Sequence, residues 1–393
     1  MSWSSGAADW GTPPWEIDAE IPETPLPARV QVCVVGGGFT GLSAAYALAR
    51  RGIDVAVLEA SRIGAGASGR TGGITLEHTA AGRRDGVNDC LPALAALVEE
   101  AGIDCALTLG GCWELAHRSA GESARTGRRV SDAASDKRLA ATPALWRDGG
   151  QELYVASVVA GGTVDPGALV AGLARAARRA GARIHQHAAV RELTPGSPSI
   201  VRVRDAVLRA DHVVLGLNAY TPALAAVRDV TPVLTFALAT EPLDDVTLAT
   251  IGLGERLPFY TQDLPYLWGR VASGGRVIFG AGLAFDPEGA LDRIDIRSGE
   301  AAAALAGLEA RVRGLHPALA GVGVSARWGG PIAFRSGRAP LLGRHADASG
   351  VIVTGAYAGH GVALSVRMGQ LAAAAIADGA TLPAWGALEK PAA

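Results

Sequence analysis

The fold of this 393-residue chain is decided by residues 30–59, VQVCVVGGGFTGLSAAYALARRGIDVAVLE. Residues 30–35 are mostly β-branched, which predicts a short buried strand. Residues 42–52 follow as a predicted helix that ends at Gly52, and residues 54–60 predict a second strand. A strand, a helix and a strand in this order indicate one βαβ unit.

The turn between the first strand and the helix has the spacing Gly36-x-Gly38-x-x-Gly41, and Glu59 closes the second strand 21 residues after Gly38. In the dinucleotide fingerprint these glycines permit the tight turn, the approach of the pyrophosphate and the packing of helix on strand. The helix N-terminus attracts phosphate, and Glu59 is expected to accept hydrogen bonds from ribose hydroxyls. A turn that binds no ligand is the weaker interpretation, because the strand, the helix and the acid all match.

A glycine-rich loop, residues 62–74, follows this unit. Ser68 and the backbone amides around it are suited to donate hydrogen bonds to phosphates, and Arg70 is suited to neutralise the phosphate charge. Thr71-Gly72-Gly73 is suited to the underside of a flat isoalloxazine ring. A flexible surface loop is the alternative, but thirteen nearly irregular residues after a βαβ unit are unusual without a ligand. The loop therefore favours FAD over NAD, which the fingerprint alone does not separate.

A second glycine cluster, GAYAGHG at residues 355–361, lies between a predicted strand and a predicted helix. The start of this helix is suited to the negative charge that a reduced flavin carries at one edge. An ordinary glycine-rich helix start explains the same residues equally well.

These motifs resemble the D-amino-acid-oxidase superfamily of FAD-dependent oxidoreductases, and within it the gamma-glutamylputrescine oxidase group. The resemblance extends from about residue 30 to residue 377. Its first and last stretches are specific to the superfamily, and the middle stretches point to the subgroup. The matching stretches are residues 32–74, 213–224, 239–243, 266–282, 327–344 and 357–376.

The resemblance implies that FAD lies against these stretches, with the backbone at Val190 beside the adenine. The substrate would lie over the flavin beneath a mixed β-sheet. The residues expected to hold FAD are Gly36, Gly38, Phe39, Thr40, Gly41, Glu59, Ala60, Arg62, Ser68, Arg70, Thr71, Gly72, Gly73, Ile74, Val190, Gly355, Gly359, His360, Gly361 and Val362.

The chain departs from these relatives where the substrate and the electron acceptor are concerned. Thr71 stands where the subgroup often has asparagine, and Ile74 where it often has glutamine. The sarcosine-oxidase branch uses a lysine beside the flavin for oxygen reduction, and neither Lys137 nor Lys390 is placed for that task. No cysteine follows Cys112, so we expect FAD to be bound non-covalently.

The expected catalytic residues are Tyr266, Trp268, Arg270 and His360. The first three alternate on one predicted strand and are suited to a substrate wall in which Arg270 binds a carboxylate. An exposed strand face with a solvated arginine is the equal alternative. His360 is expected at the flavin edge, where its protonated form or an arginine would replace the missing lysine in oxygen reduction.

Composition excludes several other classes of protein. The net charge is −2, from 36 basic and 38 acidic residues, so we expect no nucleic-acid partner. No apolar run approaches the ~20 residues that span a bilayer, and the N-terminus is no secretory signal. Four cysteines without a C-x-x-C pattern predict neither a disulfide framework nor a metal site. We expect a cytoplasmic enzyme whose oligomeric state the sequence does not indicate.

The predicted fold is α/β and has two domains. A Rossmann-like FAD-binding domain is expected from residues 28–104, 151–225 and 335–393. A substrate domain on a mostly antiparallel mixed β-sheet is expected from residues 105–150 and 226–334. Residues 1–27, which carry Trp3, Trp10 and Trp15, are expected to form an extended arm on the body of the protein.

The expected activity is oxidation of a small-molecule amine or amino acid by hydride transfer to flavin N5. The imine then hydrolyses to a carbonyl, and oxygen is reduced to hydrogen peroxide. Two alternatives stay open: an amine dehydrogenase that passes electrons to a partner protein, and a pathway-specific biosynthetic flavoenzyme. A non-catalytic binding module is least favoured, because two cofactor loops would then have no use.

Overall fold

The computed structural model describes residues 9–118, 145–225, 227, 229–262, 266–345 and 348–388, and every structural statement below concerns these residues. Trp3, Lys137 and Lys390, which the sequence analysis considered, lie outside them. Residues 119–144 of the expected substrate domain also lie outside them.

The first sheet is built around β1 (Arg29–Val35), whose last four residues are all buried. Helices cover this strand, so its apolar run is nearly continuous rather than alternating. β1 pairs in parallel with β2 (Val55–Leu58) and β11 (Ala206–Gly216), and β11 pairs in parallel with β18 (Ala348–Gly355). Both ends of the chain therefore share one sheet. Its outer strands are β8 (Arg183–His185), β9 (Val190–Thr194), β10 (Ser199–Val203) and β17 (Leu341–His345).

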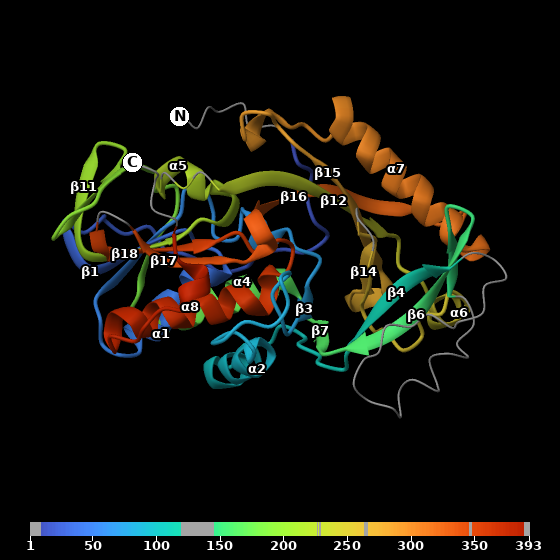
Figure 1. The fold of residues 1–393 in the computed structure, drawn as a ribbon, viewed down its shortest axis with the longest axis horizontal. Helices are drawn as coiled ribbons and strands as arrows, with labels where there is room; N and C mark the ends of the chain where they lie inside the picture. Colours follow the sequence, from blue (N-terminus) through green and yellow to red (C-terminus); the bar gives the residue numbers. More distant parts are fainter. Residues whose placement is uncertain are drawn as a thin grey trace.

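Helix α1 (Phe39–Ala49) is buried on almost every side because it packs against β1, α4 (Pro166–Arg179) and α8 (Gly361–Ala377). Figure 1 shows α1, α4 and α8 together on one side of the first sheet, with α2 (Cys90–Ala101) below them. Among the described helices, none is long and apolar enough to cross a membrane.

The second sheet has the strand order β16-β12-β15-β14-β13-β4-β6-β5. Its pairings are antiparallel except for β13 with β4, which confirms the predicted mostly antiparallel mixed sheet. In Figure 1, α7 (Gly299–Leu315) runs along the outside of this sheet near β15. The strands are β4 (Cys112–Arg118), β5 (Trp146–Asp148), β6 (Gln151–Val159), β12 (Val230–Thr240), β13 (Phe259–Thr261), β14 (Trp268–Val271), β15 (Val277–Ala284) and β16 (Val324–Arg335); two short helices are α5 (Thr221–Ala225) and α6 (Asp245–Thr250).

One segment lies elsewhere than the sequence suggested. Residues 151–225 were grouped with the nucleotide-binding domain, but β6 pairs with β4 and β5 in the second sheet. The Gly149-Gly150 turn joins β5 to β6, so it closes a hairpin instead of separating domains. The chain returns toward the first sheet through β7 (Gly161–Thr163), which pairs with β3 (Ile74–Leu76), and then through α4.

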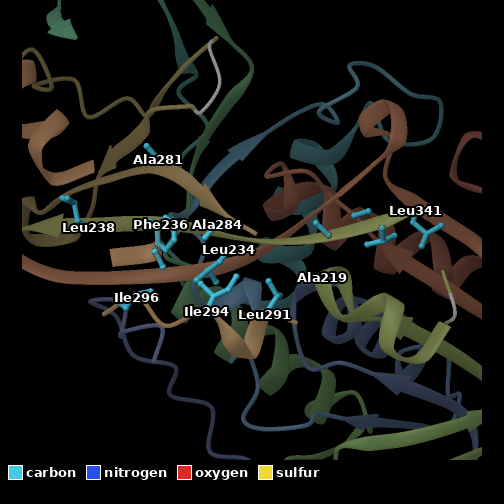
Figure 2. Close-up of a cluster of buried hydrophobic side chains, with 14 of the residues drawn as sticks. Ala219, Leu234, Phe236, Leu238, Ala281, Ala284, Leu291, Ile294, Ile296 and Leu341 are labelled. Carbon is cyan, nitrogen blue, oxygen red and sulfur yellow. The ribbon is translucent and has the colours of Figure 1, made fainter. Parts of the chain in front are cut away.

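A continuous apolar core joins the two sheets. Figure 2 shows Leu234 and Phe236 of β12 close to Leu291 and Ile294, with Leu341 of the first sheet further along the same cluster. Because β12 is long enough to reach both halves of the molecule, it carries the core from one sheet to the other.

The described part of the N-terminal arm packs on the body of the protein, as expected. The Trp10 indole N–H donates to the Ile294 carbonyl at 2.8 Å, and the Trp15 indole N–H donates to the Gly69 carbonyl at 2.8 Å. The Trp15 ring also meets Trp328 of β16 edge-on, with 5.4 Å between ring centroids. The arm therefore touches the second sheet and the glycine-rich loop at once.

Replacement of Gly41 by alanine should destabilise the fold, because an added Cβ would lie 1.9 Å from the Gly36 carbonyl oxygen. Backbone must move to relieve this contact, so we expect a loss of about 1–3 kcal/mol in the free energy of unfolding. Gly307→Ala is the control, since its Cβ meets nothing within 4 Å in α7, and helix propensity predicts a gain of up to ~1 kcal/mol. Urea unfolding followed by circular dichroism measures both; equal stability of Gly41→Ala and wild type contradicts the prediction.

Candidate active site

The fingerprint turn forms as predicted at the carboxyl end of β1. Gly36 has φ 109°, a left-handed conformation that favours glycine, and its N–H donates to the Leu58 carbonyl at 2.9 Å. Gly38 is the N-cap of α1 and supplies no capping side chain. The start of α1 therefore presents backbone N–H groups at the edge where ligands of open α/β sheets bind.

Two side chains brace this turn. The Glu59 carboxylate accepts hydrogen bonds from the backbone N–H of Gly37 at 2.8 Å and of Ser61 at 2.9 Å. Burial raises the pKa of Glu59, while these hydrogen bonds act in the opposite direction. The Ser68 hydroxyl accepts from the Phe39 N–H at 2.9 Å. The glycine-rich loop is thus tied directly to the first turn of α1.

A cavity of about 1990 Å³ extends from this turn to the second sheet. It is larger than the ~300–1000 Å³ of typical small-molecule pockets, so it has room for a large cofactor together with a substrate. The predicted residues that line it are Gly36, Gly38, Phe39, Thr40, Glu59, Ala60, Ser68, Arg70, Thr71, Gly72, Ile74, Val190, Tyr266, Trp268, Gly359, His360 and Gly361.

Six predicted residues do not line the cavity. The three glycines among them allow close packing behind the walls, as Gly73 does where a Cβ would lie 2.3 Å from the Val164 carbonyl oxygen. Arg270 and Val362 are buried. Arg62 is exposed. The six residues are Gly41, Arg62, Gly73, Arg270, Gly355 and Val362.

The Arg70 guanidinium fastens the arm to the loop. It donates to the carbonyl oxygens of Gly11 and Gly329, each at 3.0 Å, and the Trp328 indole N–H donates to the Arg70 carbonyl at 2.9 Å. Burial lowers the pKa of Arg70. Its predicted contact with a phosphate stays a prediction, and the structure adds a bracing role that the sequence did not suggest.

Arg270 holds the same loop from the second sheet. Its Nε donates to the Gly72 carbonyl, and its side chain is only 5% exposed. Burial lowers the pKa of Arg270 to about 10. The solvated-strand alternative is therefore wrong, whereas the predicted contact with a substrate carboxylate stays a prediction.

Trp268 and Tyr266 do face the cavity. A Cβ on Gly72 or on Gly280 would lie 2.1 or 2.0 Å from the Trp268 ring, so two glycines leave the space in which the indole packs. The Tyr266 hydroxyl accepts a hydrogen bond from the Arg338 guanidinium at 3.0 Å. The wall beside the glycine-rich loop is therefore aromatic and firmly held.

The second glycine cluster forms a strained turn before α8. Ala356 and Ala358 have φ 56° and 50°, left-handed values that are uncommon for alanine. The Tyr357 hydroxyl lies 2.6 Å from the Thr40 hydroxyl, which links this turn to the start of α1. His360 follows, and burial together with the charge of Arg338 lowers its pKa. The expected protonated His360 is therefore disfavoured at neutral pH.

A polar wall of the cavity was missed by the sequence analysis. Glu114 of β4, Ser157 of β6 and Tyr260 of β13 line the cavity on neighbouring strands, with Arg118 and Tyr154 beyond them. The sequence does not indicate this wall, because the three residues lie far apart in the chain and only the pairing of their strands brings the side chains together. Within the described residues, no group of three or more His, Cys, Asp or Glu side chains could hold a metal ion.

The fingerprint turn and the cavity that extends from it to the second sheet together define a dinucleotide-binding protein. Residues 31–375 match the family described as FAD dependent oxidoreductase, DAO. The chain is 30% identical over 370 residues to gamma-glutamylputrescine oxidoreductase of Escherichia coli strain K12, a match covering 87% of this chain and 82% of that protein. The chain belongs to the DAO family of FAD-dependent oxidoreductases, and FAD is its cofactor.

Solved structures show the same fold. Glycine oxidase from Geobacillus kaustophilus has a TM-score of 0.70 and 22% identity, and the match covers 93% of this chain and 100% of that chain. L-proline dehydrogenase from P. horikoshii has a TM-score of 0.69 and 18% identity, covering 91% and 96%. These likenesses confirm the predicted fold class, and the family match confirms the predicted cofactor.

Gly38→Val should abolish retention of FAD. A Cβ at this position would already lie 2.7 Å from the Ser68 hydroxyl oxygen that accepts from Phe39, and the branched side chain would fill the approach to the helix start. We expect less than about a tenth of the wild-type flavin per protein in the visible spectrum, with a wild-type circular dichroism spectrum. A folded Gly38→Val protein with full flavin content contradicts the fingerprint assignment.

The stability of the protein should fall as the pH falls below ~6.5, the unperturbed histidine pKa. Because the folded-state pKa of His360 is lowered, the unfolded chain binds more protons than the folded one in this range. His360→Asn should lose less stability between about pH 7.5 and pH 5.5, measured as the thermal midpoint. Some pH dependence of the thermal midpoint should remain in His360→Asn, because the pKa values of His78 and His185 are also lowered. His187→Asn, which removes an exposed histidine, is the control; identical slopes for wild type and His360→Asn refute the assignment.

Proposed function

We propose that this protein oxidises an amine or an amino acid at its C–N bond and passes the electrons to oxygen, which yields hydrogen peroxide. The observation that carries this proposal is the continuous cavity between the fingerprint turn and the polar, aromatic wall of the second sheet. The names of the relatives, a gamma-glutamylputrescine oxidoreductase and a glycine oxidase, support a substrate with an amino group.

The chain offers suitable contacts for FAD along this cavity. The open start of α1 suits the pyrophosphate, Glu59 lies at the ribose position of the fingerprint, and residues 71–72 suit the flat ring. When bound, FAD supplies the acceptor for the substrate hydride. With no cysteine after Cys112, we propose that it is held without a covalent bond.

The side chains around the cavity would prepare the substrate. An amine must be neutral for its C–H bond to release hydride, and burial between Trp268 and Tyr266 would favour the neutral form. His360, itself kept neutral by burial, offers a ring nitrogen that would accept a hydrogen bond from the neutral amine. Water then hydrolyses the released imine to a carbonyl compound.

A dehydrogenase that passes electrons to a partner protein is the second candidate. The lowered pKa of His360 favours it, because a neutral imidazole gives less support to the charge that forms when oxygen is reduced. For an oxidase, we propose that Arg338 would supply the positive charge instead, because it is hydrogen-bonded to Tyr266 and its charge lowers the pKa of His360.

We also propose a cytoplasmic location. Cys33, Cys90, Cys105 and Cys112 are free and buried, and burial raises the pKa of each thiol. Cysteines without disulfides are typical of a reducing compartment.

The oxygen reaction is tested separately from the amine reaction. The flavin is reduced anaerobically by light in one sample and by an amine panel in another, and both are mixed with oxygenated buffer in a stopped-flow instrument. We expect reoxidation within seconds and about one hydrogen peroxide per flavin in both samples. Reoxidation over minutes, with turnover restored by an artificial dye, identifies a dehydrogenase; a flavin that no amine reduces refutes amine oxidation.

A further inference from the structure

A row of side chains crosses the cavity side of the second sheet. The strand register pairs Ser157 with Glu114, Glu114 with Tyr260, and Tyr260 with Trp268. All four line the cavity, and the Trp268 ring lies against Gly72 of the glycine-rich loop. The row therefore connects the glycine-rich loop, which Trp268 contacts, with the carboxylate of Glu114.

Two hydroxyl groups orient this carboxylate. Ser157 donates to Glu114 Oε2 at 2.7 Å, and Tyr260 donates to Oε1 at a longer 3.4 Å. Burial and the charge of Glu114 raise the pKa of Tyr260, so its hydroxyl stays protonated. A carboxylate has about four lone-pair positions, and these two bonds leave room for further donors.

The Glu114 carboxylate has no cationic partner among the residues that the structure describes. Arg118, four residues along the same strand, forms an ion pair with Glu152 at 2.9 Å and stacks over Tyr154 at 4.9 Å. A half-buried carboxylate held only by neutral donors gains much from a cation. Within the described part of the chain, the cavity thus contains an oriented negative charge that no cationic side chain neutralises.

The position of Glu114 sets a length for the ligand. Trp268 and Glu114 are separated by two strand spacings of ~4.8 Å, so they lie about 10 Å apart across the sheet. A group bound by Glu114 is therefore well separated from atoms that lie beside the glycine-rich loop.

We propose that Glu114 binds a second, distal ammonium group of the substrate, which would be a diamine or another amine with a cationic group about 10 Å from the oxidised C–N bond. This rests on the proposed amine oxidation, because it places the reacting end beside the glycine-rich loop. Ser157 and Tyr260 are positioning residues that aim the carboxylate. Specificity for a doubly charged substrate would then come from Glu114 on β4, a strand that lies far from the fingerprint in the sequence.

The experiment compares 1,7-diaminoheptane with 7-amino-1-heptanol, which have similar length and differ in the charge of one end. Each is titrated anaerobically into the FAD-containing enzyme, and both the perturbation of the flavin spectrum and the rate of bleaching are recorded. Wild type should bind and oxidise the diamine roughly tenfold to a hundredfold better than the amino alcohol. Glu114→Gln, which keeps the shape and removes the charge, should abolish this preference.

Two variants complete the test. Glu300→Gln removes one exposed acid in the first turn of α7 and should keep the wild-type preference. Ser157→Ala should reduce the preference partly, since Tyr260 still donates to Glu114. Equal flavin content in all variants shows that each is folded.

The outcomes separate this inference from the proposed function. Bleaching of the flavin with the same diamine preference in wild type and Glu114→Gln overturns the role of Glu114 and leaves amine oxidation intact. If wild type binds the diamine more tightly, Glu114→Gln loses this advantage and neither compound bleaches the flavin, the Glu114 site is supported. The amine panel described above then decides whether the protein oxidises amines. No preference in wild type overturns the inference.

Discussion

The close approach of α1 to the end of β1 is the contact on which the rest of the structure depends. Gly41 touches the carbonyl of Gly36, and across the helix Gly369 of α8 lies where a Cβ would be 2.3 Å from the Thr40 carbonyl oxygen. Because α1 is enclosed by a strand and two helices, its N-terminus has a fixed direction. Every contact of the cofactor site, from Glu59 to Ser68, is arranged around that direction.

The second sheet is joined to this centre by buried polar contacts as well as by the apolar core. Arg270 reaches the Gly72 carbonyl from β14, while Arg70 reaches the arm and β16 from the loop. Each guanidinium satisfies backbone carbonyls that would otherwise be buried without donors, which is costly. The glycine-rich loop is thus held by the arm and by β14 and β16 of the second sheet, and its Ser68 is hydrogen-bonded to the first turn of α1.

Local sequence patterns predicted the βαβ unit, the mixed α/β fold and the cofactor, because a buried strand, a glycine turn and an acid lie within residues 30–59. Patterns of this kind say nothing about pairing between distant strands. The place of β6 in the second sheet and the row from Ser157 to Trp268 follow from register alone. The burial of Arg270 was equally hidden, since alternation along a strand does not tell which side chains reach the cavity.

The docking of the arm has a consequence for the order in which the chain folds. Residues 9–16 leave the ribosome early, yet Trp10 binds Ile294 and Trp15 packs on Trp328, which are synthesised some three hundred residues later. The sheet around β1 is likewise completed only when β18 has been synthesised and pairs with β11. The arm can therefore complete its contacts only after residue 328 has been synthesised, and the glycine-rich loop lacks the full support of the docked arm until then.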